Sequence, residues 1–333
     1  MLKRFASLLL TVAVIFIACP QISVAGAIQI KIGSAAPDTL PFIPAFEEMA
    51  KFIETKSNGK YEVTVYPMFK LGNTSTEIQG LQMGMIHFVH DGSNNVTAFA
   101  PVMGVFDLPY IFTNMDQVNH IFSGKFNETI KEYASTNTLK CLGFANSSFR
   151  NMCTNKPVKN LEDMRKMKIR VTSSKTHIAS IKSMGISVTP MPFTEVYTGL
   201  QQGVVEGFDL DYPYTVSTRL YEVAPYAFES NHMYTPQILY TGAKWWKSLS
   251  EEDRAMFEEA VDLWLTRCRN LLEEDRDRCK QVCIDAGTTV TTPDAAELAR
   301  WIDSVASTRN MMTSNQKELY EKIQAELTAA GLK

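Results

Sequence analysis

Two arginines, Arg150 and Arg170, are the residues of this chain best suited by type and position to bind an anion. Arg170 lies in the run 168–171, Lys-Ile-Arg-Val, which has the pattern of a short strand. A guanidinium group is permanently charged and planar, so it can donate two parallel hydrogen bonds to an oxyanion. A single arginine at a strand end is more often a solvated charge. The anion site is therefore a hypothesis that depends on the residues around Arg170.

A pair of carboxylates offers a second kind of chemistry. Asp209 and Asp211 are two positions apart, so on a strand their side chains point to the same face. Such a pair could bind a cation or the hydroxyl group of a substrate. A solvated pair, or one that caps a helix, is an equally good interpretation.

Motifs for catalysis and for cofactor binding are missing from the sequence. It contains no G-x-S-x-G elbow, P-loop, dinucleotide G-x-G-x-x-G, H-E-x-x-H or C-x-x-C. His87 and His90 would point to opposite faces of a strand, so they could not chelate one metal ion unless the strand bends. We therefore predict a protein that is not an enzyme and that holds no metal and no cofactor.

Residues 1–27 are predicted to be a signal peptide. Lys3 and Arg4 precede an apolar run at 8–18, and Ala-Gly-Ala at 25–27 suits a signal peptidase. The apolar run is too short for a convincing membrane span, and no later stretch is long enough to cross a bilayer. The protein is thus expected in the periplasm. Acylation of Cys19 would instead produce a lipoprotein, which is the less favoured alternative.

Charge and size exclude some classes of partner. Removing residues 1–27 takes away two basic residues and no acidic residue, which leaves 31 basic against 36 acidic residues. A net charge of −5 argues against nucleic acid as the main partner. The 306 residues that remain of 333 suffice for two core-forming lobes. A monomer is the default expectation.

Five cysteines follow the predicted signal peptide, an odd number that leaves at least one thiol unpaired within the chain. Cys141 and Cys153 flank a segment that could fold back as a hairpin, so they are the most plausible disulfide. Cys279 and Cys283 lie one helical turn apart. No histidine accompanies them, which argues against a metal site.

Hydrophobic periodicity predicts alternating strands and helices, the pattern of a largely parallel sheet. We expect a continuous or broken helix over 250–283 and a final helical stretch over 293–330. The chain has no Pro- or Ser-rich linker, so two lobes would be joined by strands and by the long helix. The other predicted strands are 28–32, 61–66, 86–89, 169–171 and 187–190, and the other predicted helices are 41–56, 76–83, 161–167 and 174–184.

Several longer stretches resemble the solute-binding proteins of TRAP transporters. They occur in the family's order and span nearly the whole mature chain. The matching stretches are 66–67 with 71–72, then 106–112, 161–164 leading into 168–171, 191–197 and 200–207.

This resemblance implies a two-lobed α/β periplasmic-binding-protein fold with a hinge and a long helix that crosses the lobes. It divides the chain into 28–147 plus about 236–275 for one lobe, and 148–235 plus about 276–333 for the other. The implied function is capture of a small organic anion between the lobes and delivery to the TRAP transporter membrane subunits.

The resemblance also assigns roles to residues. The arginine that pairs with the ligand carboxylate falls on Arg170, and a helper arginine falls on Arg150. The aromatic residue that packs on the ligand falls on Phe193, and a late histidine resembles His232.

One position departs from the family pattern. Where family members place an asparagine that donates to the ligand carboxylate, this chain has Leu210, whose side chain cannot donate. Either a hydroxyl such as that of Ser147 or Ser148 compensates, or the headgroup is not an ordinary carboxylate. A small sulfonate such as isethionate therefore stays beside carboxylates as a candidate ligand.

First-lobe contacts are predicted from position alone. Asp38, Asn73, Asp91 and Asn94 follow predicted strands, where open α/β sheets place their sites.

Two alternative functions remain open. A ligand-sensing module for a receptor kinase would share these residues, whereas a secreted hydrolase would need a nucleophile and base that the sequence does not supply.

Overall fold

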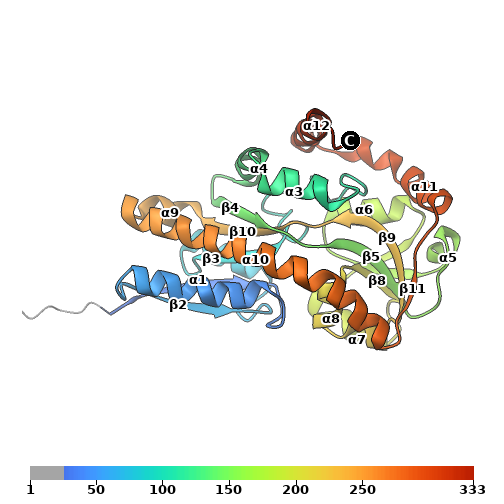
Figure 1. Ribbon diagram of the computed structural model, residues 1–333, viewed down its shortest axis with the longest axis horizontal. Coiled ribbons are helices and arrows are strands. Elements are labelled where there is room, and N and C mark those ends of the chain that lie inside the picture. Colours follow the sequence, from blue (N-terminus) through green and yellow to red (C-terminus); the bar gives the residue numbers. More distant parts are fainter. Residues whose placement is uncertain (1–25) are drawn as a thin grey trace, which may run out of the picture.

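The computed structural model describes residues 26–333, apart from the side chains of residues 273 and 274. The predicted signal peptide, residues 1–27 with Cys19, lies outside the described residues except for its last two positions. The chain forms a two-lobed α/β structure in which each lobe has its own β-sheet (Figure 1). Within residues 26–333, no helix combines the length and the apolar character needed to cross a bilayer.

The first sheet is mixed rather than parallel throughout. Strand β1 runs parallel to β2 and β3, as the predicted strand–helix–strand order requires. Strand β10, from far along the chain, inserts antiparallel between β3 and β4. The strand order is β2 (Tyr61–Tyr66), β1 (Ile28–Ser34), β3 (Phe88–Gly92), β10 (Gln237–Gly242) and β4 (Leu139–Ala145).

Helices cover both faces of this sheet. One face packs a cluster that includes Phe46 and Trp264, whose rings stack at 4.5 Å between centroids. The other face packs a separate cluster that includes Phe106 and Tyr240. The elements of this lobe are α1 (Phe42–Lys56), α2 (Thr74–Met83), the 3-10 helix η1 (Pro101–Asp107), α3 (Met115–Ser123), α4 (Phe126–Ala134) and α9 (Ala243–Ser248).

The second sheet contains the residues that the sequence singled out. Its central strand β8 pairs antiparallel with β5 and parallel with β6. The predicted strand at 187–190 forms at the edge, parallel to β6. The strand order is β11 (Thr289–Thr291), β9 (Tyr226–Tyr234), β5 (Phe149–Thr154), β8 (Gly207–Leu210), β6 (Lys168–Val171) and β7 (Ser187–Pro190).

Two clusters form the core of the second lobe, one on each face of its sheet. Ile169 and Val171 of β6 are fully buried in the cluster around Trp301, whereas Phe208 of β8 packs in the other. The helices around this sheet are α5 (Leu161–Arg165), α6 (Lys175–Ser183), α7 (Val196–Gln201), α8 (Tyr212–Ser217) and α11 (Ala295–Ser304), with 3-10 helices η2 (Phe193–Glu195), η3 (Leu220–Glu222) and η4 (Ala306–Met311).

Helix α10 (Glu251–Asp285) links the two lobes as one continuous element. It packs on α1 of the first lobe and on α8 of the second (Figure 1). The predicted final helical stretch is three separate pieces, α11, η4 and α12 (Ser314–Ala329). Helix α12 packs against η1 and α3, so it belongs to the hydrophobic cluster of the first lobe. The exact lobe boundaries stay a prediction.

Two short connections between the sheets cross the region between the lobes. Residues 146–148 join β4 to β5, and residues 235–236 join β9 to β10. Because both segments leave one sheet and enter the other, side chains on them lie where the two lobes meet. These connections and the strand ends beside them position the site.

The predicted disulfide between Cys141 and Cys153 is wrong. The two residues do not form a hairpin, because β4 and β5 belong to different sheets. Cys141 is buried in the first lobe's core and Cys153 in the second lobe's core. All five cysteines in the described part of the chain are free and buried.

We expect these five thiols to be unreactive in the folded protein. Burial raises the pKa of the Cys141 thiol to about 12 and that of Cys279 to about 11, which suppresses the reactive thiolate. A thiol-titrating disulfide reagent should detect essentially no thiol in the native mature protein and five after denaturation in guanidinium. Fewer than five on denaturation would reveal a disulfide, and rapid labelling of the native state would show that burial does not protect them.

Candidate functional site

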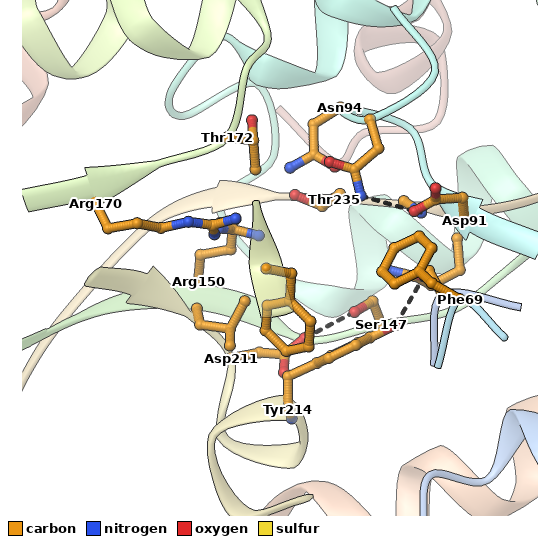
Figure 2. A pocket seen from close by; sticks show the side chains of 16 residues that line it. Phe69, Asp91, Asn94, Ser147, Arg150, Arg170, Thr172, Asp211, Tyr214 and Thr235 are labelled. Atoms are coloured by element: carbon orange, nitrogen blue, oxygen red, sulfur yellow. Dashed lines mark hydrogen bonds between the residues drawn. The ribbon is translucent and has the colours of Figure 1, made fainter. Parts of the chain in front are cut away.

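A cavity lies between the lobes and is lined by side chains from both. The first lobe contributes Phe69, Asp91 and Asn94, while the second contributes several residues including Arg150 and Arg170. Figure 2 shows the two arginines entering from one side and Asp91 across from them. The cavity measures about 50 Å³ and adjoins a wider one of about 550 Å³, which Arg170 and Asn94 also line.

Arg170 points into the cavity because of strand alternation. Its neighbours on β6, Ile169 and Val171, face the core, so the side chain between them faces the cleft. Its Nε and Nη2 atoms donate to the carbonyl oxygen of Met191 at 3.0 and 2.7 Å, which fixes the guanidinium. Burial and the nearby Arg150 lower the pKa of Arg170 to about 10, so it stays charged at neutral pH. Among the described residues, Arg170 has no carboxylate partner within ion-pair distance.

Arg150 differs from Arg170 because its guanidinium already pairs with a carboxylate. Its Nε donates to Oδ2 of Asp209 at 2.9 Å and its Nη2 to Oδ1 at 3.2 Å. Nη2 also donates to the backbone oxygen of Asp209. Both side chains are buried, at 6% and 0% exposure. Arg150 therefore lines the cavity as one half of a buried ion pair.

Two histidines complete the surroundings of Asp209. His177 Nε2 lies 2.8 Å and His232 Nε2 lies 3.4 Å from its Oδ2. Burial alone would raise the pKa of Asp209, but Arg150 and His177 outweigh it and hold this pKa well below its ordinary value. Burial lowers the pKa of His177 against the opposing effect of Asp209, whose carboxylate accepts a hydrogen bond from the His177 ring. The network orients Arg150 from behind the cavity wall.

Strand β8 carries Asp209, and at Gly207 the backbone of β8 lies very close to the backbone of β5. A Cβ atom on Gly207 would lie 2.5 Å from the backbone oxygen of Cys153 on β5, so the pairing requires glycine here. Leu210, two residues after Phe208, lines the cavity with its apolar side chain. The cavity wall therefore has an apolar side chain, which cannot donate a hydrogen bond, at this position.

Asp211 links the strand end to helix α8. Its Oδ1 accepts from the backbone N–H of Tyr214, which makes it the N-cap, and its Oδ2 accepts from the Ser147 hydroxyl at 2.9 Å. This cap places the Tyr214 ring on the cavity wall. Burial raises the pKa of Asp211. The helix-capping interpretation of this carboxylate holds, and the same residue also faces the cavity.

The first lobe supplies a buried carboxylate, Asp91, at the end of β3. Its Oδ1 accepts from the Gly92 backbone N–H and the Asn95 amide, each at 2.7 Å, and its Oδ2 accepts from the Thr74 hydroxyl at 2.5 Å. Burial raises the pKa of Asp91 to about 6. Only neutral groups donate to this carboxylate within the described structure.

Glu77 on α2, close to Asp91, should make stability fall as pH rises. It is fully buried, and neither carboxyl oxygen has a hydrogen-bond partner among the described residues. Burial, with a smaller effect of Asp91, raises its pKa from 4.5 to about 8. The folded state thus holds a proton that the unfolded chain releases above pH 4.5, so the stabilisation is complete below about pH 4.5 and is lost by about pH 8.

We expect Glu77→Gln to flatten that pH dependence, because glutamine is neutral throughout. Urea unfolding midpoints measured from pH 5 to 8.5 would show it. The control, Glu132→Gln on the exposed side of α4, should keep the wild-type slope. Equal slopes for Glu77→Gln and wild type would contradict the assignment.

Phe69 is a cavity residue that the sequence analysis missed. It and Met68 both have positive φ angles, +58° and +51°, which non-glycine residues seldom adopt. The turn directs the Phe69 ring into the cavity. Its place between the family-like stretches 66–67 and 71–72 was a signal that could have identified it. Tyr214, Asn95, Thr172, Thr235 and Gln237 also line the cavity and were not predicted.

The structure brings most predicted site residues to one cavity and places Asp209, His232, Ser148 and Asp38 outside its lining. Arg170, Arg150, Phe193, Leu210, Asp211, Asp91 and Asn94 line one cavity. Asn73 caps α2 by accepting from Thr76, and it lines the wider adjoining cavity. Asp209 and His232 do not line the cavity but lie behind Arg150, and Ser147 rather than Ser148 lines it. Asp38 is exposed and lines a separate surface hollow.

No group of three or more His, Cys, Asp or Glu side chains in the described structure is arranged to hold a metal ion. The described structure combines two sheets, a long helix that packs on both lobes, and a cavity between the lobes with a buried arginine that has no carboxylate partner among the described residues. These features define the class of two-lobed solute-binding proteins.

Comparison with known proteins identifies the family. The chain matches the model for bacterial extracellular solute-binding protein, family 7, over residues 32–322, and it belongs to that family. It is 29% identical over 302 residues to the C4-dicarboxylate-binding periplasmic protein DctP of Rhodobacter capsulatus, covering 89% of this chain and 87% of that protein.

Two solved TRAP periplasmic solute-binding proteins have a similar structure. One, from Chromohalobacter salexigens with bound D-glucuronate, is 27% identical with a TM-score of 0.84, covering 89% of this chain and 99% of that one. The other, from Shewanella oneidensis with bound succinate, is 25% identical with a TM-score of 0.85, covering 90% and 99%. The chain thus belongs to the family of TRAP solute-binding proteins, as its sequence motifs predicted.

Proposed function

We propose that this protein captures a small organic anion in the cavity between its lobes, with the anionic headgroup on Arg170. The observation that supports this most is the state of Arg170 itself. It is buried, charged, held by the Met191 carbonyl oxygen, and lacks a carboxylate partner among the described residues. A buried cation of this kind is costly unless an anion accompanies it. The related proteins that bind succinate, C4-dicarboxylates and D-glucuronate agree with a carboxylate ligand.

Closure of the lobes explains how capture would work. The cavity wall combines Asp91 and Asn94 of one lobe with Arg170 of the other, so a ligand makes its full set of contacts when the lobes are together. A ligand that binds the closed state better shifts the population toward it. The closed complex would then deliver the anion to the TRAP transporter membrane subunits from the periplasm.

The headgroup can be a carboxylate or a sulfonate. Leu210 offers no donor beside Arg170, but Thr172 and Ser147 have hydroxyl groups on the same wall. A sulfonate has three acceptor oxygens and would use donors arranged around the guanidinium rather than one bidentate pair.

A thermal-shift screen of the mature protein against carboxylates, sulfonates, neutral sugars and cations tests the proposal. A ligand at 100 times its dissociation constant adds about 2.7 kcal/mol and should raise the melting temperature measurably. We expect stabilisation by one or more organic anions. Stabilisation by neutral sugars or simple cations alone would overturn the proposal.

A further inference from the structure

The cavity contains more negative than positive charge once its ion pair is taken into account. Arg150 and Asp209 neutralise one another. Arg170 then contributes one positive charge, while Asp91 and Asp211, when ionised, contribute two negative charges on the same cavity wall. A ligand that is only an anion would satisfy Arg170 but leave both carboxylates without a counter-charge.

Neither carboxylate has a cationic partner within ion-pair distance in the described structure. Asp91 accepts from a backbone N–H, an amide and a hydroxyl, and Asp211 accepts from a backbone N–H and a hydroxyl. Both are almost fully buried, with 1% and 4% exposure. Each carboxylate oxygen has two lone pairs, so both groups keep acceptor capacity for a ligand.

Aromatic rings surround the same part of the cavity. Phe69, Phe193 and Tyr214 line it, and the last two rings meet edge to face with centroids 5.8 Å apart. The Tyr214 hydroxyl donates to Gln237 and its backbone N–H donates to Oδ1 of Asp211, so Tyr214 lies beside one carboxylate and lines the same cavity as the other, Asp91. Carboxylates beside aromatic faces suit a cationic nitrogen, because both attract positive charge.

From this arrangement we infer that the ligand is a zwitterion, with its anionic headgroup on Arg170 and a protonated nitrogen between Asp91, Asp211 and the aromatic rings. The inference rests on the proposed function and specifies its ligand class. Figure 2 shows Asp91 across the cavity from the guanidinium of Arg170. The cavity therefore has a positive group on one side and a carboxylate on the other.

The charge balance also predicts which anions the site rejects. A dicarboxylate with one carboxylate on Arg170 would direct the other toward Asp91, where like charges in a buried site repel. A hydroxyl in place of the nitrogen can donate a hydrogen bond to Asp91 but brings no charge to offset it. Zwitterions should therefore bind best, monoanions with a hydroxyl less well, and dicarboxylates worst.

Matched probe pairs test the inference by isothermal titration calorimetry on the mature protein. Taurine and isethionate share a sulfonate and a two-carbon spacer, and differ in an ammonium against a hydroxyl group. The pairs β-alanine with 3-hydroxypropanoate and 4-aminobutyrate with 4-hydroxybutyrate make the same comparison for carboxylates. We expect the amino member of a binding pair to bind at least about tenfold more tightly. Equal or tighter binding of the hydroxyl members, or no binding of any amino member, would overturn the inference.

Asp91→Asn shows whether the preference comes from this carboxylate. The variant keeps the side-chain shape and removes the charge, so the preference for the amino member should fall to about equality while the hydroxyl member still binds. Binding of the hydroxyl member also shows that the variant is folded. A full preference retained in both Asp91→Asn and Asp211→Asn would contradict the assigned role.

The two proposals fail in different ways. Binding of isethionate or a hydroxy acid that requires Arg170, without preference for the amino partner, would leave the anion receptor intact and remove the zwitterion inference. Binding of any probe that is unaffected by Arg170→Ala would remove both.

Discussion

Arg170→Ala should reduce affinity for the anionic ligand by about 30-fold to several thousand-fold, a loss of about 2–5 kcal/mol. The reason is the charge that would be left behind. If the headgroup binds as proposed, it loses its water in the closed cavity, where Arg170 is the guanidinium without a carboxylate partner in the described structure. Removing it leaves a buried anion unpaired, which costs more than the loss of two hydrogen bonds. Calorimetry with a ligand from the thermal-shift screen measures the change.

Two further variants separate this effect from general damage. Arg170→Lys keeps the charge but loses the planar fork, so its affinity should fall between wild type and Arg170→Ala. Arg278→Ala removes an arginine whose side chain is 60% exposed and pairs with Asp275 on α10, and it should bind like wild type. Affinity within about threefold of wild type in Arg170→Ala would refute the assigned role of Arg170.

The sequence was informative about Arg170 because the signal is local. Alternation around Ile169 and Val171 is enough to place Arg170 on the opposite face of its strand. The helix 42–56 and the strand pair β1 and β2 are likewise defined by periodicity within short windows. Features set by contacts between neighbouring positions could be predicted to within a few residues.

Contacts between distant parts of the chain could not be predicted in this way. The partners of Asp209 come from β5, α6 and β9, and nothing in the spacing of Arg150, His177 and His232 specifies that they meet. Strand β10 enters the first sheet from almost one hundred residues after β4.

The cysteine error has the same origin. A short segment between Cys141 and Cys153 looks like a hairpin in sequence, but residues 146–148 pass from one lobe to the other instead. The local pattern of a turn does not show which sheet the next strand joins.

Asp209→Asn should destabilise the folded protein by about 3–5 kcal/mol, because it leaves the Arg150 guanidinium buried without its counter-charge. His177 and His232 would lose the same charged acceptor. In a protein of this size the melting temperature should fall on the order of 10 °C. Differential scanning calorimetry of the ligand-free protein measures it, with Asp277→Asn on α10, whose side chain is 88% exposed, as the control.

The double variant Arg150→Met with Asp209→Leu distinguishes an unpaired charge from lost packing. If the cost of Asp209→Asn comes from the unpaired guanidinium, replacing both partners by apolar side chains should recover much of the stability. The double variant should also keep more ligand affinity than Arg170→Ala, because Asp209 already neutralises Arg150 in the wild type. A double variant that is less stable than Asp209→Asn would show that the pair supports the fold through its geometry. Binding as weak as that of Arg170→Ala would show that Arg150 contributes as much as Arg170 to binding the anion.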